Sequence, residues 1–418
     1  MMRSRLLSLG LIAAGLGVAS LASAVMAPSV AYAAEGLSPE VGKPLQAAQD
    51  LAKKGKFKEA LEEVSKAESS SKKTAYESLV IAQMRGSIAQ QAGDTGAAIA
   101  AYEAVLKSGA VEGPNSLKLV QAIAGLYNEK KDYPNAIQWL QRYRKEGGTD
   151  PAMRTALIGD YFEIKDYQNA AKEQLDQING EEKSGQTAPE TQYQLLMNCY
   201  INTKDNAAYA ALLERVVQKY PKPDYWANII HQVQVKPGFN SSRLNLDVSR
   251  LKLATGNLKS GQDYRDMIQE ALQEKSTAEA KDVLDKAFAA NLIGTGDLAP
   301  RDNKLRDFVT KTVTDDQASI DAKSGEAATN KDGQAMVDYG FDYVGYGQAD
   351  KGTKLMEDGI AADKLKHPDD EKLHLALAYL HAGQKPKALA TLKTVGGTDG
   401  PADLARVWTL FINTPPAK

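Results

Sequence analysis

The chain is patterned as a series of short amphipathic helices. Apolar side chains recur three and four positions apart, as at Ala98, Tyr102 and Val105, and Gly, Lys or Asp closes each such stretch. That spacing is typical of a helix buried along one side. The stretches come in pairs joined by a few polar residues, which predicts antiparallel helix hairpins. Four hairpin turns align by eye, at residues 54–61, 92–99, 130–137 and 164–171.

A small residue marks the point where the second helix of each pair is expected to cross the first. A large side chain nine residues earlier, such as Tyr127 or Tyr161, is expected to pack between the two helices. Successive crossing positions lie 34 to 39 residues apart, except for two gaps of 71 and 72. Each gap is close to two repeats, so we expect a degenerate helix pair in each, near 224–258 and near 298–326. The crossing positions are Ala60, Ala98, Ala136, Ala170, Tyr209, Ala280, Gly352 and Ala388, and in the fifth unit Tyr209 replaces the small residue.

This unit resembles the tetratricopeptide repeat (TPR), a helix hairpin of about 34 residues with a Tyr in its first helix and small residues in its second. The copies are partial, because none has the leading Trp of the consensus. The resemblance covers roughly residues 44–396 and implies an all-α fold, a right-handed superhelix of TPR-like antiparallel helix pairs. Pro401 to Ile412 is predicted to be a C-terminal capping helix, with Trp408 on the last pair, because repeat arrays need such caps.

The same pattern predicts the organisation of the chain. Gly294, Gly296 and Pro300 make Asn291 to Arg301 the expected hinge or domain boundary. The expected segments are a signal peptide at 1–33, a flexible segment at 34–43, five TPR-like units at 44–219, a degenerate pair and one unit at 220–296, a degenerate pair or linker at 297–330, and two units with the capping helix at 331–418.

The first residues have the layout of a secretory signal peptide. Two arginines in Met1 to Arg5 precede 22 uncharged residues, Leu6 to Ala27. Small residues at Ala31 and Ala33 favour cleavage behind Ala33, and a cut after Ala24 is the alternative. An uncleaved anchor is a third possibility, since such a stretch could span ~30 Å of hydrocarbon. We expect a periplasmic or secreted protein that meets a membrane only through an uncleaved leader.

Charge and cysteine content narrow the expected partners. Removing residues 1–33 leaves 49 basic and 53 acidic side chains. This near balance argues against nucleic acid or an anionic membrane as the main partner, because neither would meet a basic stripe. The partner is therefore expected to be a protein or peptide. Cys199 is the only cysteine, which excludes an intramolecular disulfide, and we expect it to be a small buried hydrophobe.

The motifs that would indicate nucleotide or metal binding are incomplete in this sequence. Residues 347–354 nearly spell a phosphate-binding loop, but Thr precedes Lys where the motif needs the reverse. Residues 294–299 match the loose dinucleotide fingerprint, yet they follow a helix, so a loop is expected. His374 and His381 lie about 10 Å apart along one predicted helix and cannot share a metal ion. We expect no enzymatic activity, no cofactor and no metal site.

The TPR resemblance implies a concave surface lined by the first helix of each pair. Its positions here are mostly amides, which both donate to and accept from a peptide backbone. The alternative is that they are ordinary solvated helix surface. The family's Lys- and Arg-lined groove for carboxyl-terminal peptides is not matched. The candidate partner-binding residues are Gln83, Ser87, Gln90, Gln121, Asn128, Gln194, Asn198 and Asn202.

Three hypotheses for function follow. The first is an exported scaffold that binds a partner protein or peptide on its concave face, in the bacterial cell envelope. The second is a glycan-binding helical solenoid in envelope polysaccharide handling. The third, an enzyme acting on peptidoglycan from a helical superhelix, needs a catalytic domain for which no segment is left, although a pair of acids distant in sequence could serve. The stacking residues of the second would be Trp139, Tyr225, Trp226 and Trp408.

Overall fold

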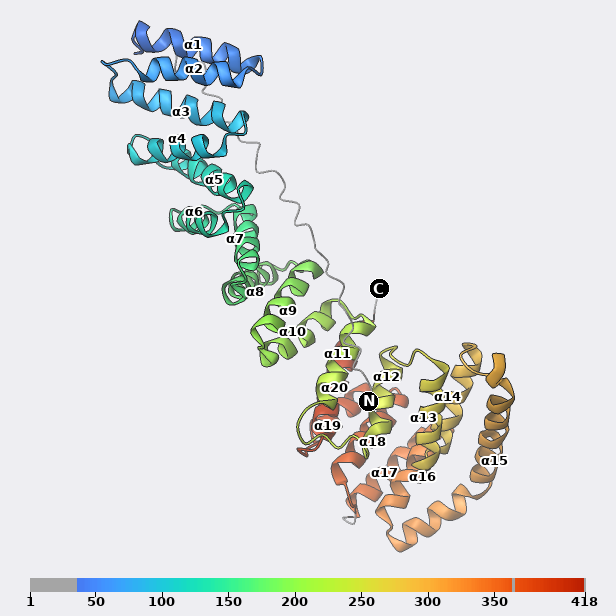
Figure 1. Cartoon of the computed structure of the whole chain (residues 1–418). Helices are drawn as coiled ribbons and strands as arrows, with labels where there is room; N and C mark the ends of the chain where they lie inside the picture. The colour runs from blue at the N-terminus through green and yellow to red at the C-terminus, as the bar shows by residue number, and fades with distance from the viewer. Residues whose placement is uncertain (1–35, 363–364, 417–418) are drawn as a thin grey trace. The chain divides into compact units, whose positions relative to one another are not determined.

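The protein is all-α throughout the part of the chain that the structure describes. The computed structural model describes residues 36–362 and 365–416, and helices alternate there with short turns (Figure 1). The expected signal peptide and its cleavage sites lie outside these ranges. No helix within them combines the length and the apolar composition needed to cross a bilayer. The predicted fold class, TPR-like antiparallel helix pairs, is confirmed.

The chain divides into two compact units, residues 1–205 and 206–418. The division falls at Asp205, between the two helices that were expected to form the fifth pair. The expected boundary, Asn291 to Arg301, instead lies inside the second unit, where it forms turns and a short 3-10 helix, Gly296–Leu298. A turn that contains glycine therefore does not identify the boundary between the units, because every hairpin of this chain contains a turn.

Unit 1 is a stack of helix hairpins. Helix α1 begins at Pro39, inside the segment expected to be flexible. Proline is suited to the first turn of a helix, and Val41, Leu45 and Ala48 follow at the spacing that buries one helix side. The helices are α1 (Pro39–Lys53), α2 (Phe57–Glu68), α3 (Ala75–Gln91), α4 (Thr95–Lys107), α5 (Pro114–Glu129), α6 (Tyr133–Lys145), α7 (Pro151–Glu163), α8 (Tyr167–Lys183) and α9 (Glu190–Thr203).

The predicted crossings are confirmed in unit 1. The four alanines at the crossing positions are fully buried. A Cβ atom on Gly86 of α3 would lie 2.4 Å from the Tyr102 ring of α4, so the pair could not pack as it does with a larger residue there. Tyr161 of α7 is buried as predicted, but its hydroxyl accepts a hydrogen bond of 2.6 Å from Gln141 of α6, the second helix of the preceding pair, and not from its own partner α8.

A left-handed residue lies five positions before every crossing position. This conformation reverses the chain after the first helix of each pair, and glycine adopts it without steric cost. Lysine occupies it in half of the units. The residues are Gly55, Gly93, Lys131, Lys165, Lys204, Lys275, Gly347 and Gly383, with φ between 56° and 81°.

Unit 2 contains one of the two degenerate pairs that the gaps predicted. Helices α11 and α12 form it near 224–258. The other prediction is wrong: residues 299–330 form one 32-residue helix, α15. No left-handed residue interrupts α15 before Lys331, so the chain has no turn at which to reverse. The helices are α10 (Asn206–Lys219), α11 (Pro223–Gln234), α12 (Asn245–Ala254), α13 (Gly261–Gln273), α14 (Thr277–Ala289), α15 (Ala299–Asn330), α16 (Gly333–Gly345), α17 (Ala349–Ala361), α18 (Pro368–His381), α19 (Lys385–Leu392) and α20 (Pro401–Asn413).

The last helix closes unit 2 on itself. Helix α20 packs on α18 and α19, as a capping helix should, but also on α10, α11 and α12 (Figure 1). Trp408 stacks edge-on against Phe411, which in turn contacts Trp226 of α11. Aromatic pairs in this geometry stabilise by about 0.5–1.5 kcal/mol beyond their burial. Unit 2 is thus a closed ring of helices rather than an open stack.

Candidate functional site

The first helices of successive pairs in unit 1 are joined by side-chain hydrogen bonds. Gln121 of α5 donates to Asp150 at 3.3 Å, and Asn128 donates to Asp160 of α7 at 2.9 Å. Asp150 also accepts from the backbone N–H of Ala152, so it begins α7 as its N-cap. We call these two contacts the α5–α7 bridge. They place Gln121 and Asn128, two of the predicted partner-binding residues, on one side of unit 1.

Asp160 is the electrostatically unusual group of this bridge. It is almost fully buried, and burial raises its pKa to about 6. The hydrogen bond from Asn128 opposes that shift because it stabilises the charged form, while the nearby Glu163 carboxylate adds to it. Asp160 therefore changes charge close to neutral pH, and the amide of Asn128 keeps it ionised.

The other predicted residues lie on α3 and α9. Ser87 is buried and accepts a hydrogen bond from Gln91 at 3.2 Å. Gln90 accepts from the Tyr102 hydroxyl at 2.9 Å, which turns it toward α4. Gln83 is half-buried. These contacts serve the packing of the second hairpin, so the α3 group presents less polar surface than the sequence predicts.

On α9 the predicted residues are more exposed. The Asn202 amide donates to the backbone oxygen of Asn198 at 2.9 Å and to its side-chain oxygen at 2.6 Å. Gln194 donates to Glu190 at 3.5 Å. The eight residues thus form three groups, on α3, α5 and α9, and whether they bind a partner stays a prediction.

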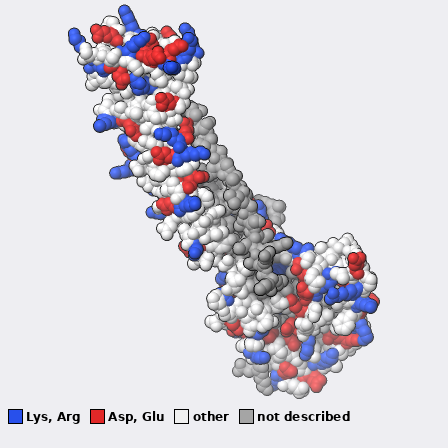
Figure 2. All heavy atoms as spheres, viewed as in Figure 1, with Lys and Arg blue, Asp and Glu red and all other residues white. Residues whose placement is uncertain are grey.

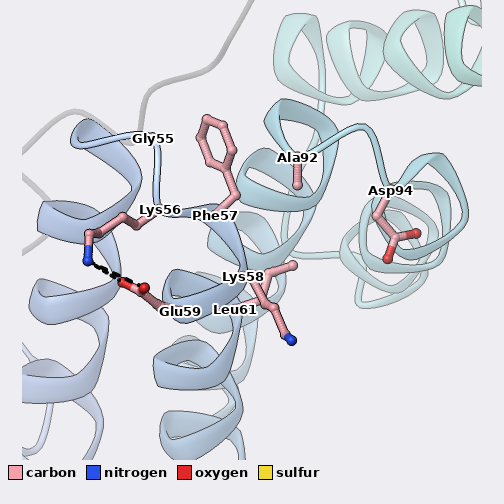
Figure 3. A pocket seen from close by; sticks show the side chains of 8 residues that line it. All are labelled: Gly55, Lys56, Phe57, Lys58, Glu59, Leu61, Ala92 and Asp94. Carbon is pink, nitrogen blue, oxygen red and sulfur yellow. Dashed lines mark hydrogen bonds and ion pairs between the residues drawn. The ribbon is translucent and has the colours of Figure 1, made fainter.

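Two shallow hollows lie elsewhere in unit 1. The larger, of about 420 Å³, is lined by the α1–α2 and α3–α4 turns, with Lys56 and Glu59 paired at its side (Figure 3). The smaller, of about 290 Å³, lies among α6, α7 and α8 next to Arg144 and Glu173. Neither is lined by a predicted partner-binding residue. On the visible face of the molecule, acidic and basic side chains are interspersed (Figure 2).

Unit 2 holds a chain of buried ionic contacts that sequence reasoning missed. Arg250 of α12 binds Glu279 of α14 at 2.7 and 2.8 Å and Asp247 at 2.7 Å. His374 of α18 then bridges Asp247 and Glu371, each at 3.1 Å. We call this run from Glu279 to Glu371 the ionic chain. Gln334 of α16 extends it by donating to Glu371 at 2.9 Å.

His374 carries a positive charge in this arrangement. Both ring nitrogens face carboxylates, which only accept hydrogen bonds, so both nitrogens must donate. Burial alone would lower the pKa of His374, but the charges of Asp247 and Glu371 raise it to about 10. Likewise, burial would raise the pKa of Asp247, and His374 and Arg250 instead lower it to about 2.

The ionic chain lies between two apolar cores. One core comes from α12 to α15 and the other from α16 to α19. Phe341 of α16 has the Arg250 guanidinium 5.0 Å from its ring centroid. The sequence did carry a local signal, since Asp247 and Arg250, and Glu371 and His374, are each three residues apart. The contact between the two pairs spans 127 residues and has no local signature.

The remaining candidate residues have packing roles. Cys199 is fully buried as predicted, and burial raises the pKa of its thiol to about 12. Residues 347–354 span the end of the α16–α17 turn and the start of α17, where a Cβ on Gly352 would meet the Gly340 backbone oxygen at 2.4 Å. Residues 294–299 are a loop with a 3-10 turn, as predicted. Among the described residues, no three His, Cys, Asp or Glu side chains are arranged to hold a metal ion.

The aromatic residues of the glycan hypothesis are mostly unavailable for stacking. Tyr225, Trp226 and Trp408 are buried in unit 2, because the closure by α20 covers them. Trp139 is half-buried, and the guanidinium of Arg142 lies 5.0 Å from its ring centroid. The structure therefore presents no row of exposed aromatic rings from these four residues.

Several solved structures are similar to this chain, and two of them illustrate how weak the likeness is. The chain is similar to the structure of Naa15/Naa10 bound to HypK-THB, at 12% identity and a TM-score of 0.31, covering 84% of this chain and 63% of that one. It is also similar to the APC/C hetero-tetramer Cut9–Hcn1, at 10% identity and a TM-score of 0.18, covering 88% of this chain and 83% of that one. The chain thus spans less than two thirds of the first matched chain.

No family model and no curated protein matches the sequence. Both TM-scores are below 0.5, so the description of the fold rests on the helices of this structure and not on these likenesses. Those helices make the chain an all-α protein of TPR-like hairpins, with an open stack in unit 1 and a closed ring in unit 2.

Proposed function

We propose that this chain is a non-enzymatic scaffold that holds a partner protein or peptide in the bacterial cell envelope, after export. The binding surface is the first-helix face of unit 1, made by α1, α3, α5, α7 and α9 on the side turned away from their second helices. The leader-like sequence at 1–33 supports export, and the near-balanced charge of the chain supports a protein partner.

The observation that carries this proposal is the α5–α7 bridge. It connects the first helices of two successive pairs through polar side chains, so the amides of Gln121 and Asn128 lie on a shared surface. Because an N–H of each amide already donates within unit 1, such a surface offers a polypeptide only the remaining hydrogen-bonding groups of these amides, across more than one repeat. In unit 2, by contrast, the polar side chains between α12, α14, α16 and α18 bind one another along the ionic chain.

The test is a crosslinked pull-down from an envelope extract with the full chain as bait. Recovered proteins are compared between the native chain and a variant in which Gln121, Asn128, Gln194 and Asn198 are all replaced by alanine. A partner that uses the first-helix face should be recovered in stoichiometric amount with the native chain and lost with the variant. Recovery that is the same with both baits would rule this surface out.

A matched control separates loss of contact from loss of folding. Gln138 and Gln168 are exposed on the second helices α6 and α8, so replacing them with alanine removes amides from the opposite side of unit 1. This control should retain the partner. Circular dichroism and thermal unfolding of all three proteins check that unit 1 stays folded, since Asn128 also stabilises the buried Asp160.

A further inference from the structure

One buried acid of unit 1 has no positive charge to compensate it. Asp160 of α7 is 3% exposed, and its Oδ2 accepts a hydrogen bond of 2.9 Å from the neutral amide of Asn128. Among the described residues, no hydrogen bond to its Oδ1 and no ion pair to either carboxylate oxygen is present. Burying a carboxylate costs free energy unless a positive charge or several N–H groups offset it. Asp160 can therefore accept a further, positively charged donor.

The other buried acids in the described part of the chain each have such an offset. Glu77 accepts hydrogen bonds from backbone N–H groups at the starts of α1 and α3, and Asp342 accepts one at the start of α14, where the helix dipole is positive. Asp160 lies near the end of its helix and has no such donor. The remaining buried acids each bind an arginine or a histidine; they are Glu173, Asp247, Asp302, Asp370 and Glu371.

The groups around Asp160 are suited to a cation. Glu163, one helical turn further along α7, is exposed and acts electrostatically on Asp160. Both carboxylates also act on Tyr133 at the start of α6, so its side chain lies near the two of them. We call Asp160, Glu163, Asn128 and Tyr133 the acidic notch. Carboxylates, a side-chain amide oxygen and an aromatic ring are groups that bind an ammonium or a guanidinium.

We propose that the acidic notch binds a lysine or arginine side chain of the partner, which supplies the positive charge that Asp160 lacks. The inference rests on the proposed function, because the notch includes Asn128 and adjoins the α5–α7 bridge on the first-helix face. It adds the chemistry of the partner, a polypeptide segment with a basic side chain placed over α7. The Lys- and Arg-lined groove that selects a terminal carboxylate has the opposite charge, so the notch selects against such an acidic end.

Binding through the notch should weaken as pH falls. The groups that face Asp160 are Asn128 from α5, Tyr133 from α6 and Glu163 from its own helix, and no charged group of α8 acts on it in the described part of the chain. Burial raises the pKa of Asp160 to about 6, and a bound cation should return it toward its ordinary value of about 3.9. Since the pKa falls on binding, binding releases a proton, and the affinity at pH 5 should be about tenfold lower than at pH 7.

The direct test is an NMR titration of the full chain with a defined probe. Acetyl-arginine amide is the probe, and acetyl-citrulline amide is its uncharged counterpart of nearly the same shape. The arginine probe should shift the side-chain amide signal of Asn128, with the weaker affinity at pH 5, and the citrulline probe should leave that signal in place. An Asn128 signal that ignores the arginine probe, or that responds equally to both probes, would overturn the proposal.

Three variants separate binding from folding. Asp160→Asn keeps the size of the side chain and removes its charge, so affinity for the arginine probe should fall at least tenfold, while resistance to urea at pH 7 should not fall, because no uncompensated charge is buried. Lower resistance to urea with unchanged probe affinity would give Asp160 a purely structural role. Glu163→Gln, at an exposed position, should weaken binding by a smaller factor and serves if Asp160→Asn does not fold. Glu62→Gln removes an exposed acid from the second helix α2 and should change neither quantity.

The crosslinked pull-down then distinguishes this inference from the proposed function. A partner that is lost with the quadruple alanine variant and also with Asp160→Asn supports both the first-helix face and the notch. A partner that is lost with the quadruple variant but recovered in full with Asp160→Asn keeps the first-helix face and overturns the notch. Equal recovery with the native chain and both variants rejects the two proposals together.

Discussion

At the residue scale, each unit contains a buried titratable group whose charge depends on a neighbouring side chain. Asp160 in unit 1 is a buried acid with a raised pKa, and His374 in unit 2 is a buried base whose pKa two acids raise. Each depends on one neighbour that holds its charge: Asn128 for Asp160, and Asp247 for His374. Both groups make their unit less stable as pH rises, but in different pH ranges, which allows them to be separated by experiment.

Unit 2 should lose stability as the solution becomes alkaline. The folded pKa of His374, about 10, is above its unfolded value near 6.5, so its contribution is complete below about 6.5 and is lost as pH rises through 10. Chemical denaturation between pH 7 and 10.5 should show this fall. His374→Gln should cost about 3 kcal/mol at pH 7 and flatten the pH dependence. If the variant keeps the native dependence of the unfolding free energy on pH, His374 is not the cause of that dependence.

Asn128→Leu should raise the pKa of Asp160 above its native value of about 6, because it removes the hydrogen bond that favours the carboxylate. Carbon-detected NMR of the Asp160 carboxyl measures the shift directly. The folded pKa is above the unfolded value of about 3.9, so unit 1 should gain stability as pH falls from 7 toward 4. The variant should cost about 1–2 kcal/mol at pH 7, and less at pH 5. Gln138→Leu on α6 is the matched control and should change neither quantity.

At the scale of helices and turns, the recurring feature is the left-handed residue five positions before each crossing position. The sequence showed the turn and the small residue but not that lysine would adopt φ near +60°. It also did not show that α15 would continue through 32 residues. Both outcomes follow from packing. Packing holds the lysines of four turns in a left-handed conformation that costs free energy. In α15 no residue adopts that conformation, so the helix does not turn back.

Lys131→Gly and Lys165→Gly should each stabilise unit 1 by about 0.5–1 kcal/mol, because glycine adopts the left-handed conformation without the Cβ clash. Urea denaturation followed by circular dichroism measures the difference. Lys130→Gly is the control: Lys130 has φ of −74°, so glycine there only adds unfolded-state entropy and should destabilise. Equal effects at positions 130 and 131 would contradict the explanation.

At the scale of the whole molecule, the two units differ in whether the last helix packs back onto the first ones. Unit 1 is a stack of hairpins, while unit 2 returns its last helix to its first three. Repeat arrays without long-range contacts unfold by local steps, and a ring adds cooperativity because its ends depend on each other. The division at Asp205 gives each unit its own interior contacts.

Calorimetry of the full chain should therefore show at least two transitions. His374→Gln should lower only the transition of unit 2, and Asn128→Leu only that of unit 1, because each residue contacts its own unit. A mutation that moves both transitions equally would mean that the units unfold together. The alkaline shift predicted for His374 should also appear in one transition only.

The sequence by itself determined the hairpins, their turns, the small crossing residues and the burial of Cys199. These depend on residues within one or two helix turns of each other, where periodicity and turn chemistry act locally. The candidate partner-binding residues could be named from the repeat, but only the structure joined Gln121 and Asn128 to α7 and turned Gln90 toward α4.

Only the tertiary structure decided the division of the chain and the closure of unit 2. The contacts of Arg243 with Asp399 and of Asp247 with His374 join residues more than 120 positions apart, and nothing in the local pattern selects one acid among 53 as the partner. The ring forms because α20 reaches α10, α11 and α12, and that closure then buries charges which must pair with each other. Long-range geometry, and not local propensity, placed the ionic chain in unit 2.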